Sequence, residues 1–208
     1  MYMIITYHGT QHVKLALGDL TIAYNPVSKA AGKVTKYGAH IALVSMNTPE
    51  YNGVSEATHG SKELFTVTGP GEYETQGVFI QGVGVETKTK SGMHINTIYT
   101  FNLDNMSICF LGSLSKKLTA REREVINDTD IVFVCEGSAV ENLNIAELYQ
   151  TAQSLSPKII IPIGFSDTTL PLFLREAGTD TREYIEKLTI KRKDIETKNG
   201  EVIALMEV

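Results

Sequence analysis

The sequence lacks the segments that direct a protein through or into a membrane. Its first residues, MYMIITYHGT, contain neither a basic stretch nor a long apolar run, unlike a secretory signal peptide. The longest apolar stretches, such as residues 158–165, are far shorter than the roughly 20 residues that a membrane-spanning helix needs. We therefore expect a cytoplasmic protein that does not enter the membrane.

Cysteine is also scarce. The two cysteines, Cys109 and Cys135, lie in the apolar runs SICFL and IVFVCEG and do not form the CxxC spacing of a metal or redox site. A disulfide is not expected without a secretory signal, because the cytoplasm keeps thiols reduced. The sequence predicts two buried thiols on strands.

An excess of basic residues is absent. Nineteen Lys and Arg face 24 Asp and Glu, and the net charge of −5 disfavours a nucleic-acid partner, which would need a basic surface. The one dense basic cluster, at residues 191–193, is followed at once by Asp194 and Glu196. We interpret this cluster as the solvated end of a strand.

Two common catalytic signatures are missing as well. The chain contains neither a P-loop nor the GxSxG turn of α/β-hydrolases. The tripeptide Asp167-Thr168-Thr169 precedes an apolar stretch and is interpreted as the N-cap of a helix rather than as a catalytic group.

The pattern of what is present changes half-way along the chain. Short strands separated by turn residues fill the first half, and strands alternate with helices in the second. Strands are expected at residues 3–7, 13–17, 20–24, 39–44, 65–68, 78–85, 97–102, 106–111, 130–134, 158–163 and 202–206. Helices are expected from Thr119, over residues 144–155 and over residues 170–177. The order predicts packed sheets with helices outside them, in a single domain over residues 1–208.

Several segments, in order, resemble the metallo-β-lactamase superfamily, and most closely the compact branch that includes the ascorbate-6-phosphate lactonases. These segments are ITYHGTQHVKLALGDLTIAYNP, IALVSMNTPEYNGV, GPGEYETQGVFIQGV, NTIYTFNLDNMSICFLGSL and KIIIPIGF. The resemblance spans residues 3–165 and implies an α/β fold, the αββα sandwich of the metallo-β-lactamase type. It also implies a site on loops at one edge of the sandwich, where active members hold zinc and activate water.

The resemblance also implies that the metal ligands have been replaced. The positions of the family's ligands are occupied here by Met46, Thr48, Glu50, Tyr51, Ser113 and Gly164. A further histidine would lie near Glu86 or Thr87, and the family's Asp-Pro pair reads Asn25-Pro26. Thioether, hydroxyl and phenol groups are poor substitutes for imidazole toward Zn²⁺, so we expect no metal cofactor.

Two functions remain open at this stage. The first is a catalytically silent domain that binds an unknown small molecule or protein. The second is a metal-dependent hydrolase of a lactone or phosphoester that uses a rearranged site, in which Glu50, Glu72 and Glu74 would converge with His59 or His94. The simpler interpretation of residues 69–74, GPGEYE, is a tight turn that leads into a strand.

The replaced residues lead to a further expectation. All five histidines (8, 12, 40, 59 and 94) are expected in structural or exposed positions. Met46 and Tyr51 are expected to fill the former cleft and to be largely buried, because a neutral plug avoids the cost of desolvated charge. Glu50 is a candidate partner for the Tyr51 hydroxyl if the loop turns it inward.

Overall fold

The computed structural model describes residues 1–126, 128–137, 140–141, 143–179 and 184–208, and these form two β-sheets with few helices. The first sheet has six strands, in the order β12 (Lys187–Ile190), β1 (Met3–Tyr7), β2 (Val13–Leu17), β3 (Leu20–Tyr24), β4 (Ile41–Leu43) and β5 (Phe65–Val67). Strands β12, β1, β2 and β3 pair antiparallel, whereas β4 and β5 run parallel to β3.

The second sheet has seven strands. Their order is β13 (Glu201–Val202), β11 (Ile159–Ile163), β10 (Ile131–Cys135), β9 (Met106–Ser113), β8 (Gly92–Leu103), β7 (Val78–Thr89) and β6 (Gly71–Thr75). Strands β9, β10, β11 and β13 are parallel, so β9, β10 and β11 end at the same edge of the sheet. Strand β6 is the outermost strand at the other side.

The main core lies between the two sheets. Alternate residues of each strand point inward, for example Leu15 of β2 and Phe110 of β9, and both are fully buried. The rings of Tyr24, Phe110 and Phe133 stack in series, with centroids 4.0 and 4.1 Å apart. Because all three lie in the middle of the sandwich, this stack joins the sheets at their centre.

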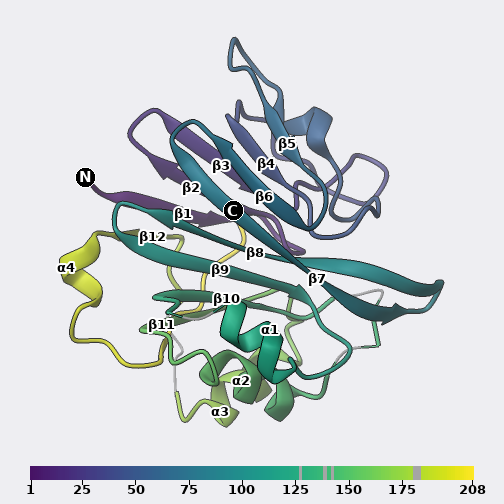
Figure 1. The fold of residues 1–208 in the computed structure, drawn as a ribbon, viewed down its shortest axis with the longest axis vertical. Helices are drawn as coiled ribbons and strands as arrows, with labels where there is room; N and C mark the ends of the chain where they lie inside the picture. Colours follow the sequence, from purple (N-terminus) through teal and green to yellow (C-terminus); the bar gives the residue numbers. More distant parts are fainter. Residues whose placement is uncertain (127, 138–139, 142, 180–183) are drawn as a thin grey trace.

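Three helices cover the other face of the second sheet, as Figure 1 shows: α1 (Ala120–Val125), α2 (Ile145–Gln153) and α3 (Leu170–Glu176). Both α1 and α2 begin with a capping box, in which Thr119 pairs with Glu122 and Asn144 pairs with Glu147. Each box satisfies free backbone N–H groups at the helix start. The helix predicted from Thr119 is therefore confirmed together with its cap.

The outer face of the first sheet has a thinner cover. Among the described residues, this face is covered by the short 3₁₀-helix η1 (Val54–Ala57) and irregular loops, with Ala23, Ala39 and Ala57 packed together. The four-residue α4 (Arg192–Ile195) instead connects β12 to β13 and inserts Ile195 into the main core. The predicted metallo-β-lactamase-type fold class is confirmed, with most of its helical mass on one side.

The central hairpins extend beyond the expected strand limits. Residues 88–94 lie outside the expected strands at 78–85 and 97–102, yet they continue β7 and β8 almost to their turn, with Thr89 opposite Gly92. In residues 69–74, interpreted as a tight turn that leads into a strand, the strand already begins at Gly71, and residues 71–75 form the edge strand β6. Each strand of the β7–β8 hairpin therefore has 12 residues.

Two predictions about the C-terminal part also need correction. The basic cluster at residues 191–193 starts α4 rather than ending a strand, and Arg192 pairs with Asp130. The last strand covers Glu201–Val202 instead of residues 202–206. No helix in the described part of the chain is long and apolar enough to cross a membrane.

The two cysteines lie where the sequence placed them. Cys109 of β9 and Cys135 of β10 are fully buried free thiols. They belong to different clusters, Cys135 between the sheets and Cys109 under the helices. Adjacent strands thus direct the two thiols to opposite faces of one sheet.

Candidate functional site

The predicted site residues come from loops at one end of the sandwich. Met46, Thr48, Glu50 and Tyr51 follow β4, and Ser113 is the last residue of β9. The hydroxyls of Tyr51 and Ser113 lie 3.2 Å apart, within hydrogen-bonding distance. The structure therefore brings together two positions that are 62 residues apart in the sequence.

Gln11, between β1 and β2, links these hydroxyls to the first sheet. Its Nε2 atom donates to Ser113 Oγ at 2.7 Å and to Tyr51 Oη at 3.1 Å. Its Oε1 atom accepts from Asn25 Nδ2 at 3.1 Å. Gln11, Asn25 and Ser113 are all fully buried, so these bonds form in a region without solvent.

Asn25 extends the network to Ser45. Asn25 Nδ2 donates to Ser45 Oγ at 2.8 Å, and the Ser45 backbone N–H donates to Asn25 Oδ1 at 2.8 Å. The backbone of Asn25 has a φ of +43°, a left-handed conformation that asparagine tolerates better than most residues. We call Gln11, Asn25, Ser45, Tyr51 and Ser113 the polar plug.

Asn96 of β8 holds the strand end that carries Ser113. Its Oδ1 accepts from the Ser113 N–H at 3.1 Å, and its Nδ2 donates to the Leu111 carbonyl at 2.9 Å. A Cβ on Gly112 would lie 2.1 Å from Asn96 Oδ1, and Gly112 has a φ of +63°. Glycine at position 112 is thus required both by conformation and by this close approach.

Met46 and Tyr51 form an apolar cap on the plug together with Val140. Met46 is 3% exposed and Tyr51 is 2% exposed. Their predicted burial is confirmed. Glu50 is half-buried, and the Tyr51 hydroxyl bonds to Gln11 and Ser113 instead of to Glu50.

Gly164 closes the site from the second sheet. It follows β11 with a φ of +75°, and its N–H donates to Tyr7 Oη at 3.0 Å. A Cβ there would meet the Glu136 carbonyl oxygen at 2.4 Å and Gln11 Cγ at 3.2 Å. The space that a side chain at position 164 would need is therefore already filled.

Comparison with known proteins gives the family. Residues 4–164 match the family model described as the β-lactamase superfamily domain, which is more than half of the chain. The chain belongs to the metallo-β-lactamase superfamily. None of the curated proteins matches the chain.

Solved structures of the superfamily share the fold of this member. A protein of Thermotoga maritima, assigned to the zinc-dependent hydrolases of the superfamily, is 21% identical with a TM-score of 0.75, covering 98% of this chain and 100% of that chain. A metallo hydrolase of Ignicoccus hospitalis is 12% identical with a TM-score of 0.64, covering 91% and 98%. A metallo-β-lactamase fold protein of Bacillus subtilis is 9% identical with a TM-score of 0.64, covering 100% and 98%.

The donor atoms around the plug do not suit the zinc of this superfamily. Zinc in proteins is held by imidazole, thiolate or carboxylate, whereas the plug offers amides and hydroxyls that already bond to one another. Burial raises the pKa of Tyr51 to about 12, although its hydrogen bond with Ser113 opposes the shift. The phenol is therefore protonated at neutral pH and is a poor metal ligand.

Among the described residues, the carboxylates and histidines considered for a rearranged metal site are not gathered into a metal-binding group. Glu72 and Glu74 are exposed on β6, and His59 is exposed just after η1. His94 lies on β8, where its Nε2 is 3.1 Å from Ser91 Oγ. The described part of the chain contains no group of three or more His, Cys, Asp or Glu that could hold a metal ion.

His8 and His12 form an aromatic group with Tyr37, in which His12 is buried and the other two side chains are half-buried. His12 Nε2 lies 2.7 Å from Tyr37 Oη, and the His8 and His12 ring centroids are 5.0 Å apart. Lys14 Nζ lies over the Tyr37 ring, 4.8 Å from its centroid. Burial lowers the pKa of His12 to about 3, and the nearby His8 and Lys14 add to the shift. His12 is therefore a neutral structural residue.

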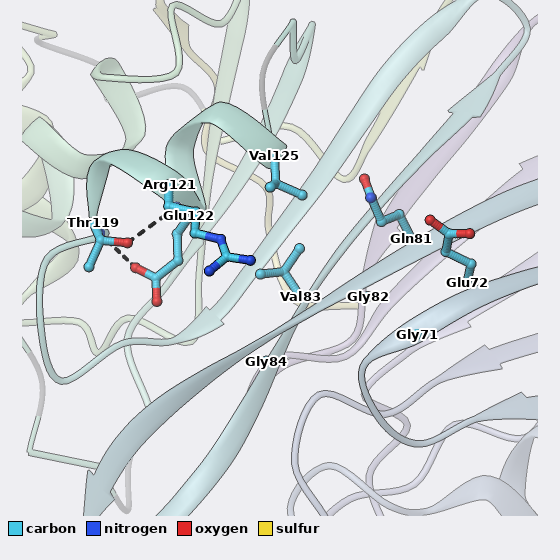
Figure 2. A pocket seen from close by; sticks show the side chains of 10 residues that line it. All are labelled: Gly71, Glu72, Gln81, Gly82, Val83, Gly84, Thr119, Arg121, Glu122 and Val125. Atoms are coloured by element: carbon cyan, nitrogen blue, oxygen red, sulfur yellow. Dashed lines mark hydrogen bonds between the residues drawn. The ribbon is translucent and has the colours of Figure 1, made fainter.

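A cavity of about 530 Å³ lies away from the plug, between β6, β7 and α1. In Figure 2, Arg121 extends toward Val83, while Glu72 and Gln81 lie on the other side. The carboxylate of Glu122 turns back to the Thr119 N–H as part of the capping box. None of the plug residues lines this cavity.

Sequence reasoning missed Gln11, Ser45 and Asn96, which hold the plug together. None of them stands at a ligand position of the family. The available signal was their residue type, because uncharged amides and hydroxyls in or next to strands need partners when they are buried.

Proposed function

We propose that this protein is a catalytically silent member of the metallo-β-lactamase superfamily that works as a binding domain. The observation that carries the proposal is the polar plug. Where the family resemblance places metal ligands, the uncharged side chains of Tyr51 and Ser113 bond to each other and to Gln11, out of contact with water.

Chemistry supports this proposal. Metal-dependent hydrolysis in the fold needs a cation that lowers the pKa of bound water toward neutrality. The plug offers no carboxylate, imidazole or thiolate to hold that cation, and the pKa of Tyr51 is raised rather than lowered. The buried hydroxyls are therefore not activated as nucleophiles either.

Packing supports it as well. Met46 and Val140 pack against Tyr51 and cover the rest of the plug. At Gly164, neighbouring atoms occupy the space that a side chain would need. A metal-dependent hydrolase must admit substrate and water to its metal-binding residues. Side chains that fill the cleft exclude both and stabilise the fold instead. The retained fold then presents other surfaces to a small molecule or a protein.

We also propose a cytoplasmic location. The support is the state of Cys109 and Cys135, which are buried thiols on opposite faces of one sheet. Reduced thiols of this kind are typical of proteins in a reducing compartment.

The test combines metal analysis with an activity panel. Untagged protein purified without chelator is analysed for zinc, iron and manganese, and then assayed with lactone, phosphomonoester, phosphodiester and thioester substrates with each metal added. We expect far less than one metal per chain and no turnover above that of buffer. Stoichiometric metal, or turnover that rises with added metal, would contradict the proposal.

Matched variants make any residual activity interpretable. Glu50→Gln removes the one carboxylate at a family ligand position, and Ser113→Ala removes a plug hydroxyl. Glu124→Gln, at an exposed position on α1, is the control. Turnover that is lost in Glu50→Gln but kept in Glu124→Gln would identify the rearranged hydrolase; equal background in all variants supports the silent domain.

A further inference from the structure

A second cavity opens beside the plug, between the loop that follows β11 and the segment 203–208. It has a volume of about 440 Å³. Three aromatic residues, Tyr7, Phe165 and Tyr184, line it together with Leu205 and two acidic residues, Asp167 and Glu207. We call it the terminal cavity.

The aromatic walls are held in place by bonds outside the cavity. The Tyr7 hydroxyl donates to the Thr10 carbonyl at 3.0 Å and accepts from the Gly164 N–H at 3.0 Å. Phe165 packs against Phe173 of α3, with ring centroids 4.9 Å apart. The two rings therefore present fixed surfaces and lose little freedom when a ligand contacts them.

The segment 203–208 is fixed as well. The Val208 N–H donates to the Tyr7 carbonyl at 3.1 Å, and the Met206 N–H donates to the Ile185 carbonyl at 2.9 Å. Gly9 lies against Glu207, because a Cβ there would be 2.5 Å from the Glu207 carboxyl carbon. With a φ of +86°, Gly9 both allows the turn and leaves space for the carboxylate.

The charged residues that line the terminal cavity are all acidic. Asp167 and Glu207 are its charged lining residues, and neither makes an ion pair with any residue that the structure describes. Burial lowers the pKa of the nearby His8, so this ring does not neutralise Glu207 at neutral pH. Glu207 in turn adds to the rise in the pKa of Tyr7, whose largest cause is burial.

We propose that the terminal cavity binds an organic monocation, an amine or quaternary ammonium group attached to an apolar or aromatic body. Aromatic faces attract such cations, and unpaired carboxylates complement their charge. A ligand anion would be repelled by Asp167 and Glu207. The volume fits a small molecule rather than a protein segment. This inference does not depend on whether the chain hydrolyses anything.

The test uses phenethylamine as the probe, with 2-phenylethanol as its neutral analogue and 3-phenylpropanoate as its anionic analogue. Binding is measured by calorimetry and by ligand-observed NMR at low salt and near-neutral pH. We expect saturable binding of the amine, binding of the alcohol weaker by about tenfold, and no binding of the anion. Higher salt should weaken the binding of the amine but not that of the alcohol, because salt screens charge–charge attraction.

Variants locate the site. Glu207→Gln and Asp167→Asn should each weaken amine binding by about two- to fivefold, as expected for exposed charge pairs. Tyr184 is 39% exposed, and Tyr184→Ala should weaken the binding of the amine and of the alcohol to the same extent. Glu124→Gln, an exposed carboxylate on α1 outside the cavity, should leave both unchanged.

Several outcomes would overturn the proposal. Equal affinity for the amine and the alcohol would leave no role for the carboxylates. Amine binding that is lowered as much by Glu124→Gln as by Glu207→Gln would mean attraction to net charge only. If Glu207→Gln fails to fold, the exposed positions Asp167 and Tyr184 still decide the result.

Discussion

Replacement of Met46 by alanine tests whether the apolar cap stabilises the fold. Met46 is 3% exposed and packs with Tyr51 and Val140. Truncation of a buried methionine to alanine costs about 2–5 kcal/mol, from the lost transfer free energy and the cavity that remains. This cluster has three buried members at the end of the sandwich, where neighbours can move inward. We therefore expect the lower half of that range, about 2–3 kcal/mol.

The chain contains its own control for this experiment. Met93, on the β7–β8 hairpin, is 62% exposed, so Met93→Ala should change the free energy of unfolding by less than about 0.5 kcal/mol. Urea unfolding curves of both variants and of the wild type give the comparison. If Met46→Ala also costs less than about 0.5 kcal/mol, the reasoning fails, because the cleft would then be open to water.

Four further results are expected. Tyr51→Phe removes one of the buried hydrogen-bond partners of Gln11 and of Ser113, which still bond to each other, and should cost about 1–3 kcal/mol in the same urea assay. No change would mean that water replaces the hydroxyl. Asn25→Asp places a carboxyl group among neutral partners, so the pKa of this group rises in the folded protein. The variant should therefore be less stable near neutral pH than in mild acid, and a free energy of unfolding that does not change with pH would contradict this. His12 has a pKa of about 3 in the folded protein, so its contribution to the free energy of unfolding is complete above the pKa of unfolded histidine and is lost as the pH falls. Between about pH 7 and about pH 5, the free energy of unfolding of the wild type should fall by about 2 kcal/mol, and that of His12→Gln should not. Chelator or added Zn²⁺ should leave the melting temperature unchanged, whereas a true site at 100 times its Kd would add about 2.7 kcal/mol.

The sequence predicted the hydrophobic framework well because strand and helix signals are local. Strands β1, β2 and β3 have the predicted limits, α1 begins at the predicted cap Thr119, and α2 lies within the predicted range 144–155. Extension of β7 and β8 through residues 88–94 was missed, since polar residues such as Lys88 and His94 are compatible with a loop. Their strand conformation depends on cross-strand pairing, which no local pattern encodes.

The candidate site was predicted in part. Burial of Met46 and Tyr51 followed from the family resemblance and the chemistry of desolvated charge. The partner of Tyr51 did not follow, because Gln11 reaches it from a loop 40 residues away in the sequence. Hydrogen-bond partners of this kind depend on how the two sheets meet, so only the three-dimensional structure reveals them.

The edge strand β6 has a consequence for how copies of this protein meet. Among the strands that the structure describes, β6 pairs with β7 alone and forms the end of the seven-stranded sheet. Such an edge can recruit the same strand of another molecule and start aggregation. Glu72 and Glu74 are exposed along it. If two copies aligned their β6 strands, these four carboxylates would be crowded together. We therefore expect the two glutamates to oppose self-association through this edge at high concentration, and neutral residues in their place to weaken that effect.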